Sequence, residues 1–180
     1  MLKKWKTLSR QEVHKNPYWT AYHDVFEKAD GKQGDYYHLV YPGGVEIIAQ
    51  RNDGRVILVE QYRYLYGHSV LSFPGGSVEA GKDPEQTARE ELLEETGYQA
   101  GSIKLLGKRY ISPGLFHYID TFFLATDLVQ DVPRPGETEE FIYHYKTPAE
   151  IDQMMAAGEI MSGNATCAWT LARPHLQLET

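Results

Sequence analysis

The chain has 180 residues, of which 42% are hydrophobic and 12% aromatic, and its formal net charge is −7. These values are typical of a single globular domain with its own core, and the negative charge argues against nucleic acid as the main partner. The one cysteine, Cys167, excludes an internal disulfide. No apolar run follows the basic start, and no stretch approaches the roughly 20 residues of a membrane span, so we expect a cytoplasmic protein with no membrane partner.

The first half of the chain is predicted to be rich in β-strands. Residues 1–40 are expected to form a β-rich extension of one domain that covers residues 1–180. Residues 45–50 are strand-like, and Asn52-Asp53-Gly54 is a hairpin signal. Residues 56–59 form a continuous apolar run, which is typical of a strand that is covered on both faces.

Residues 75–98 carry the strongest local pattern, with the sequence GGSVEAGKDPEQTAREELLEETGY. A double glycine and a polar loop precede a short helix. Asp83 is suited to cap this helix, Pro84 to its first position, and Gln86 to the spacing of a capping box. Gly97 is suited to the left-handed residue that ends it.

The predicted helix carries four carboxylates in six residues: Glu90, Glu91, Glu94 and Glu95. At 100° per residue, Glu91 and Glu95 share one face and Glu94 lies on its edge, next to the apolar face of Leu92. The two like-charge pairs at i,i+4 cost only about 0.2–0.5 kcal/mol each, so repulsion alone does not demand a bound cation. A solvated acidic face is the alternative interpretation of this pattern.

The second half of the chain continues with strands and ends in helices. Residues 103–111 and 117–125 are strand-like and are separated by the turn Ser112-Pro113-Gly114. A proline-rich acidic loop covers residues 130–138, and residues 141–145 are again strand-like. Capping signals predict one helix from Thr147 to about Gly158 and another over residues 164–173. This order indicates an α/β (α+β) protein.

The stretch from Gly76 to Tyr98 resembles the Nudix box. The residues in register with that motif are Gly76, Glu91, Leu92, Glu94, Glu95, Gly97 and Tyr98. Two positions depart from it, since Lys82 stands where the first Glu of the box belongs and Glu90 stands where its Arg belongs. The resemblance implies the Nudix fold, a mixed β-sheet sandwiched between α-helices.

The resemblance also implies a metal site and a class of reaction. Nudix enzymes hold Mg²⁺ or Mn²⁺ on the box helix and cleave a nucleoside diphosphate linked to another moiety. The metal ligands carried over are Glu91, Glu94, Glu95 and the backbone carbonyl of Gly75. Hard oxygen ligands suit a hard divalent cation that binds a diphosphate and activates water.

Further positions resemble the ADP-ribose pyrophosphatase branch of the family. Gln61-Tyr62-Arg63 matches a Gln-aromatic-Arg motif of this branch, and Pro113, sixteen residues past Gly97, matches its downstream proline. The resemblance makes Arg63, Pro113 and Gly114 substrate-binding residues, and Trp19 is a candidate for stacking on the base. The alternatives are a surface charge at Arg63, an ordinary β-turn, and an aromatic side chain packed in a core or a dimer contact.

The catalytic base is expected in the loop Pro135-Gly136-Glu137-Thr138-Glu139-Glu140. Related enzymes use a Glu of the matching loop, and Glu139 is the first choice, followed by Glu140 and then Glu137. By itself the loop pattern indicates a solvated acidic loop. Glu94 is counted among the catalytic residues as well as the metal ligands.

Together these features predict hydrolysis of ADP-ribose or a similar nucleoside diphosphate sugar to a nucleoside monophosphate and a sugar phosphate. Members of this branch are commonly homodimers, so we expect a homodimer. The alternatives are a non-hydrolytic sensor of nucleotide sugars, or a pyrophosphatase for GDP-mannose or dinucleoside polyphosphates.

The two departures from the box have opposite signs. In the family the first box Glu and the box Arg are expected to pair, and Lys82 and Glu90 reverse both charges. We therefore predict that the pair is kept with its polarity exchanged. The alternative is two independent surface residues and a degenerate site.

Overall fold

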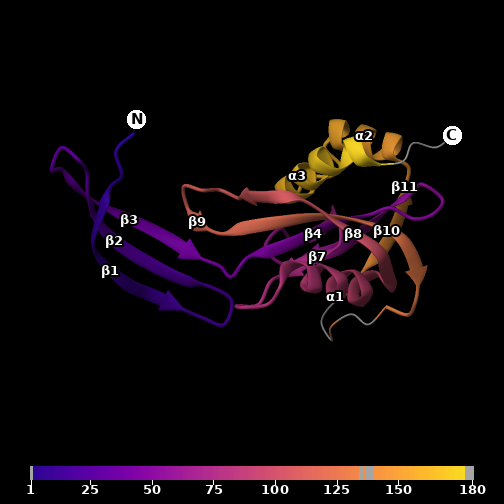
Figure 1. Ribbon diagram of the computed structural model, residues 1–180, viewed down its shortest axis with the longest axis horizontal. Coiled ribbons are helices and arrows are strands. Elements are labelled where there is room, and N and C mark those ends of the chain that lie inside the picture. Colours follow the sequence, from indigo (N-terminus) through magenta and orange to yellow (C-terminus); the bar gives the residue numbers. More distant parts are fainter. Residues whose placement is uncertain (1, 134–135, 137–139, 177–180) are drawn as a thin grey trace. The chain divides into compact units, whose positions relative to one another are not determined.

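The computed structural model describes residues 2–133, 136 and 140–176. The chain forms two compact units, one of residues 1–43 and 110–119 and the other of residues 44–109 and 120–180. Figure 1 traces both units along the chain. The expectation of one domain over residues 1–180 stays a prediction.

The first unit is a four-stranded sheet with the order β1-β2-β3-β9. Its strands are β1 (Lys6–Lys15), β2 (Thr20–Glu27), β3 (Gln33–Val40) and β9 (Phe116–His117). Neighbours among β1, β2 and β3 are antiparallel, and β9 is parallel to β3. At the β1–β2 turn, Asn16 Oδ1 accepts hydrogen bonds from the backbone N–H groups of Tyr18 and Trp19, both at 2.9 Å.

The second unit contains two sheets. One has the order β7-β4-β10-β8, made of β4 (Gly44–Ala49), β7 (Gly75–Ser77), β8 (Tyr98–Tyr110) and β10 (Ile119–Gln130). Strand β4 is parallel to β10 and antiparallel to β7, so this sheet is mixed. The other sheet is antiparallel, with the order β11-β5-β6, made of β5 (Val56–Arg63), β6 (His68–Ser72) and β11 (Ile142–Lys146).

Helices cover both faces of the mixed sheet (Figure 1). They are α1 (Pro84–Thr96), α2 (Pro148–Ala157), α3 (Gly163–Ala172) and a 3₁₀ turn at Arg173–His175. In Figure 1, α1 lies on one side of β4 and β7, and α2 and α3 lie on the other. The predicted α/β (α+β) fold with a mixed sheet between helices is confirmed. In the described part of the chain, every helix is too short or too polar to cross a bilayer.

The predicted helix ends are confirmed with one correction. The Asp83 side chain accepts from the Glu85 N–H, and Gly97 is left-handed with φ 72°. At α2, Thr147 and Glu150 form a capping box, and Gly158 is left-handed with φ 75°. The capping box expected for Gln86 is wrong, because its side chain donates to Glu90 Oε1 at 2.8 Å.

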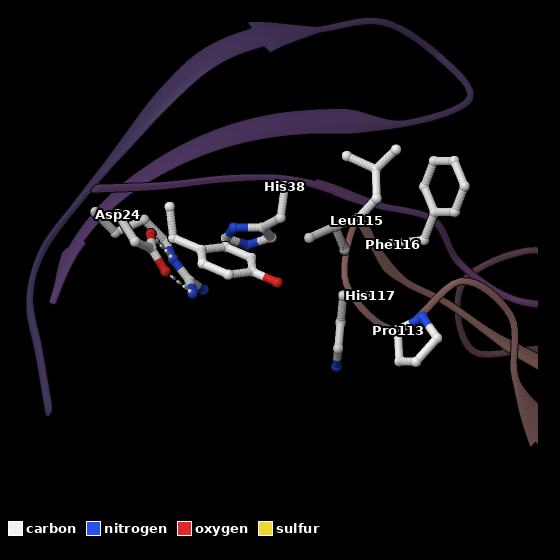
Figure 2. Close-up of a pocket in the computed structure, with 9 residues that line it drawn as sticks. Asp24, His38, Pro113, Leu115, Phe116 and His117 are labelled. Atoms are coloured by element: carbon white, nitrogen blue, oxygen red, sulfur yellow. Dashed lines mark hydrogen bonds and ion pairs between the residues drawn. The ribbon is translucent and has the colours of Figure 1, made fainter. Parts of the chain in front are cut away.

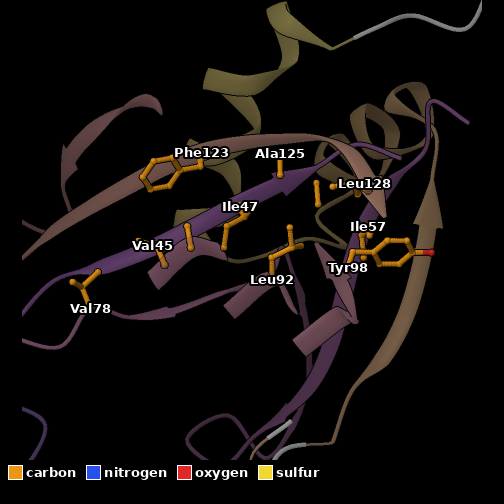
Figure 3. Packing of buried hydrophobic residues seen from close by; sticks show 11 residues of the cluster. Val45, Ile47, Ile57, Val78, Leu92, Tyr98, Phe123, Ala125 and Leu128 are labelled. Atoms are coloured by element: carbon orange, nitrogen blue, oxygen red, sulfur yellow. The ribbon is translucent and has the colours of Figure 1, made fainter. Parts of the chain in front are cut away.

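The core of the second unit lies between β4 and α1 (Figure 3). Ile47 of β4 and Leu92 of α1 are fully buried, and Val45 is 4% exposed. The predicted burial of residues 56–59 is confirmed, since none is more than 2% exposed. This packing fixes the position of α1, and therefore of its carboxylates, against the sheet.

We expect Leu92→Ala to lower the free energy of unfolding by about 2–5 kcal/mol, because it leaves a cavity under α1. The control is Leu105→Ala on β8, where the native side chain is 53% exposed, with an expected loss of about 1 kcal/mol or less. Urea denaturation followed by fluorescence measures both. Equal losses for the two variants would contradict the core assigned here.

Candidate active site

The carboxylates of α1 lie in different environments. Glu95 is only 5% exposed, Glu91 is half-buried and Glu94 is exposed. Ala88 and Leu92 are fully buried on the adjoining face, as the helical spacing predicts. The helix therefore directs Glu91 and Glu95 toward the sheet and leaves Glu94 at the surface.

The backbone of the double glycine, Gly75 and Gly76, contacts these two carboxylates. The Gly75 N–H donates to Glu95 Oε2 at 2.9 Å. A Cβ atom at Gly76 would overlap the carboxylate of Glu91, and one at Gly75 would overlap the backbone carbonyl of Val45. Glycine is required at position 75, where the overlap is with the backbone of β4, whereas a side chain at position 76 would displace the Glu91 carboxylate from its place beside the backbone. The structure thus brings together three of the predicted site residues: Gly75, Glu91 and Glu95.

Glu46 is a site carboxylate that the sequence analysis missed. It lies on β4, is 6% exposed, and pairs with Gly75 across the sheet. Burial is the largest cause that raises the pKa of Glu46; together with the negative charges of Asp120 and Glu95 it brings this pKa to about 8, although a hydrogen bond from the Phe73 backbone opposes the shift. At neutral pH Glu46 is therefore mostly protonated. The signal in the sequence was a charged residue within the apolar run Val-Glu-Ile-Ile.

Asp120 and Asn164 form a second buried polar contact on the α3 side of the sheet. Asp120 is 1% exposed, and Asn164 Nδ2 donates to its Oδ2 at 2.5 Å. In the β4–β10 register, Asp120 pairs with Gly44 and Phe122 pairs with Glu46, so Asp120 and Glu46 share one face of the sheet. The chain was predicted to be helical near Asn164, but local spacing carries no signal for this long-range contact.

Arg63 lies at the exposed end of β5. Its positive charge acts on Glu46 and lowers the pKa of that carboxyl, against the larger effect of burial. Arg63 is therefore near the Glu46–Glu95 group. Of the predicted bases, Glu140 is exposed and precedes β11, while Glu139 and Glu137 lie outside the described residues.

Pro113, Gly114 and Trp19 belong to the first unit. Pro113 lines a cavity of about 300 Å³, and Figure 2 shows its side chain with those of Asp24 and His38 around this space. The turn at residues 112–114 is confirmed by two backbone bonds to the Ser112 carbonyl.

The other two candidates make contacts within the same unit. The Gly114 carbonyl accepts from the Tyr36 hydroxyl at 2.6 Å. The Trp19 ring is half-buried and lies 5.1 Å from the His14 ring, measured between centroids. Their predicted contacts with substrate stay predictions.

Two protein families match the chain. Residues 40–161 match the NUDIX domain, which is more than half of the chain. The chain belongs to the Nudix hydrolase family. Residues 5–39 match the nucleoside diphosphate sugar hydrolase N-terminal domain. The boundary between the two matches falls close to residue 43, where the N-terminal segment of the first unit ends.

Relatives agree with this assignment. The chain is 32% identical over 138 residues to an ADP-ribose pyrophosphatase of Bacillus subtilis, covering 76% of this chain and 75% of the relative. It is 30% identical to a GDP-mannose pyrophosphatase of Klebsiella pneumoniae, covering 77% and 75%. The predicted family and its ADP-ribose pyrophosphatase branch are confirmed.

A solved structure supports the fold. The crystal structure of an ADP compounds hydrolase superposes with a TM-score of 0.87 at 22% identity. The alignment covers 97% of this chain and 95% of that chain. At this identity the likeness confirms the fold of the Nudix domain and its N-terminal extension.

The two departures from the Nudix box meet in space. Lys82 Nζ lies 3.8 Å from Glu90 Oε2, so the predicted contact between them is confirmed. Lys82 also lies 3.3 Å from Glu79 Oε1, and the hydrogen bond to Glu79 is the largest cause of the raised pKa of Lys82. The Gln86 side chain donates a hydrogen bond to the other carboxylate oxygen of Glu90. The loop before α1 is thus tied to the helix by a small charged network.

The oxygen-rich Nudix helix fits a divalent cation, the kind of ion that Nudix hydrolases generally use. The double glycine lies against the carboxylates of Glu91 and Glu95 and the carbonyl of Val45, and oxygen atoms of these kinds are the ligands of a hard cation. Within the described residues, no three carboxylate, imidazole or thiol side chains stand close enough to form a metal site by themselves.

We expect Lys82→Glu to reduce turnover, because it places a third carboxylate beside Glu79 and Glu90. Glu90→Arg should also reduce it, by placing a second cation beside Lys82. The double variant should recover much of the lost activity but not all, since Glu79 stays next to the new carboxylate at position 82. Turnover of nucleoside diphosphate sugars in a double-mutant cycle gives the coupling. Strictly additive losses would show that the contact does not position the helix.

The free energy of unfolding should fall as pH rises from about 4.5 to about 8. Over this range the folded chain keeps a proton on Glu46, whose pKa is about 8, while the unfolded chain loses it. One such group gives a slope of at most about 1.4 kcal/mol per pH unit. Glu46→Gln keeps an acceptor for Phe73 and should make the curve flatter. Urea denaturation with a chelator present measures the slopes, and identical slopes would refute the assignment.

Proposed function

We propose that this Nudix hydrolase cleaves the diphosphate bond of ADP-ribose or a similar nucleoside diphosphate sugar. The products are a nucleoside monophosphate and a sugar phosphate. The observation that carries the proposal is the contact of Glu91 and Glu95 with the double glycine at residues 75–76. Relatives that are named for ADP-ribose and GDP-mannose support the same class of substrate, as does the N-terminal family match.

The ion in this proposal is Mg²⁺, with Mn²⁺ as a substitute. Glu91, Glu94, Glu95 and the Gly75 carbonyl are the proposed ligands. A bound ion of this kind neutralises the diphosphate and lowers the pKa of the attacking water. The Gly75 N–H holds one oxygen of Glu95 in place, so that its carboxylate is oriented before any ligand arrives.

Other residues orient the substrate in this proposal. The guanidinium of Arg63 supplies a planar fork of donors that suits phosphate oxygens. Pro113, Gly114 and Trp19 are proposed to contact the nucleoside part. Water attacks phosphorus, and a carboxylate from residues 137–140 accepts its proton, with Glu139 as the first choice and Glu140 as the second.

A second candidate function is a sensor that binds a nucleotide sugar without cleaving it. The observation that favours it is the exchange of charge at Lys82 and Glu90. Because these two side chains lie within 3.8 Å of each other, the exchange preserves a contact between loop and helix. We therefore place hydrolysis first.

The proposal includes a homodimer in a cytoplasmic setting. All ten residues of β1 are exposed, and among them are the apolar side chains of Leu8 and Val13. An exposed edge strand of this length is suited to pairing with another chain. Light scattering tests the dimer. The single cysteine is compatible with a reducing compartment.

We expect Mg²⁺-dependent release of AMP from ADP-ribose, and a loss of at least about a hundredfold in rate for Glu95→Gln. The substitution deletes a charge aimed at a dication, and about 3 kcal/mol of lost transition-state stabilisation gives this factor. The panel comprises ADP-ribose, ADP-glucose, GDP-mannose and diadenosine polyphosphates, each assayed with Mg²⁺ and with Mn²⁺. Chromatography of the nucleotide products measures the outcome.

The control is Glu85→Gln on the exposed side of α1, which should leave the rate within about twofold of the parent. Near-normal turnover of Glu95→Gln would remove Glu95 from the metal site. If a nucleotide of the panel binds tightly but is not hydrolysed, the result would contradict the proposed hydrolysis and favour the sensor function.

A further inference from the structure

A backbone carbonyl at the end of the Nudix helix has its partner on a distant strand. The Tyr143 hydroxyl donates a hydrogen bond to the carbonyl oxygen of Glu95 at 2.8 Å. Tyr143 is half-buried and lies on β11, which belongs to the antiparallel sheet. The reaction proposed above gives this tyrosine no role.

Helix α1 cannot satisfy this carbonyl by itself. The last four carbonyls of an α-helix have no N–H group four residues later within the same helix. For Glu95 that N–H belongs to Gln99, which is already part of β8. The Leu93 carbonyl, by contrast, accepts from the N–H of Gly97 at 2.9 Å. Tyr143 therefore caps the last turn of α1 from another strand.

Glu95 is held through both its side chain and its backbone. Its carboxylate accepts from the Gly75 N–H of β7, and its carbonyl accepts from the Tyr143 hydroxyl of β11. Strands β7 and β11 belong to different sheets, so Glu95 joins the Nudix helix to both sheets of the second unit. Helix ends fray readily. A bond on the last turn therefore limits the movement of Glu94 and Glu95, two of the proposed metal ligands.

The end of α1 also receives a second long-range bond. The Asp131 N–H donates to the Gly97 carbonyl at 2.6 Å, and the Gln99 side chain donates to Asp131 Oδ2 at 2.8 Å. Glu140, the second choice for the catalytic base, lies between Asp131 and Tyr143 in the sequence. The end of the metal-binding helix is thus bonded to the chain both before and after Glu140.

We propose that Tyr143 is a positioning residue for the metal site and that it acts through the backbone of Glu95. The inference rests on the proposed function, because it assigns a support to one of the proposed metal ligands. Ligands bind an ion tightly only when neighbouring groups hold them in place. The loss of a group that orients a ligand typically lowers metal affinity or activity by about 10–100-fold.

Tyr143→Phe tests the proposal, because it removes the hydroxyl and keeps the ring. We expect the dissociation constant for Mn²⁺, measured without substrate by electron paramagnetic resonance of the free ion, to rise by about tenfold. With ADP-ribose and saturating Mg²⁺, kcat should fall by about tenfold while KM stays within about twofold, since no proposed substrate contact is altered.

Two controls separate positioning from stability. Tyr145→Phe deletes a hydroxyl from the same strand, but this hydroxyl is bonded to Tyr98 of β8 and not to α1. Thr147→Ala removes the N-cap of α2, which lowers stability away from α1. Both variants should keep the Mn²⁺ dissociation constant and kcat within about twofold of the parent, because neither contact supports a proposed ligand. Thermal melting measures the stability of every variant.

The outcomes separate the two proposals. If Tyr143→Phe loses stability but binds Mn²⁺ and turns over substrate like the parent, the inference is refuted while the proposed function stands. Equal losses of Mn²⁺ affinity in Tyr145→Phe would also overturn it. If the parent binds Mn²⁺ but hydrolyses no nucleotide of the panel, the proposed hydrolysis fails, and weaker Mn²⁺ binding by Tyr143→Phe still supports the positioning role. If the parent binds no Mn²⁺, the proposed metal site and the inference fail together.

Discussion

The hydrogen bond from the Gly75 N–H to Glu95 is the interaction on which the rest of the site depends. Glu95 is 5% exposed, and a buried carboxylate is costly unless it is bonded or neutralised. The bond requires β7 to lie against α1 with a bare backbone between them. The double glycine provides this approach, because a side chain at either position would overlap Val45 or Glu91. One local constraint therefore sets the distance between helix and sheet and the orientation of two carboxylates.

Much of this arrangement was predictable because it is encoded locally. Helix α1 begins and ends where Asp83 and Gly97 predict, since capping depends on residues within one turn. The buried face of α1 follows from the 3.6-residue period, and the burial of residues 56–59 follows from their continuous apolar run. The contact of Lys82 with Glu90 was predictable from charge reversal at two positions of one motif.

The rest depends on partners that are distant in sequence. Strand β1 is exposed along its whole length, so its sequence shows no alternation of apolar and polar residues that could mark its bounds. Asp120 and Asn164 are 44 residues apart, and only the packing of α3 on the sheet brings them together. Glu46 was missed because a strand pattern predicts burial of its neighbours but not which groups surround a buried carboxyl. Those surroundings are defined by the register of β4, in which Glu46 pairs with Gly75 of β7 and Phe122 of β10.

Strand β4 separates the buried carboxyl of Glu46, on one face of the sheet, from the Nudix helix on the other face. Its alternation turns Val45 and Ile47 toward α1, where they form the apolar support of the Nudix helix. Glu46 points to the opposite face, which it shares with Asp120, and burial keeps it mostly protonated at neutral pH. A charged Glu46 would add a negative charge near Glu95 and disfavour ionisation of that carboxylate, which is one of the proposed metal ligands. The protonated Glu46 instead accepts a hydrogen bond from the Phe73 backbone, two residues before Gly75. A protonated Glu46 therefore adds no negative charge near Glu95.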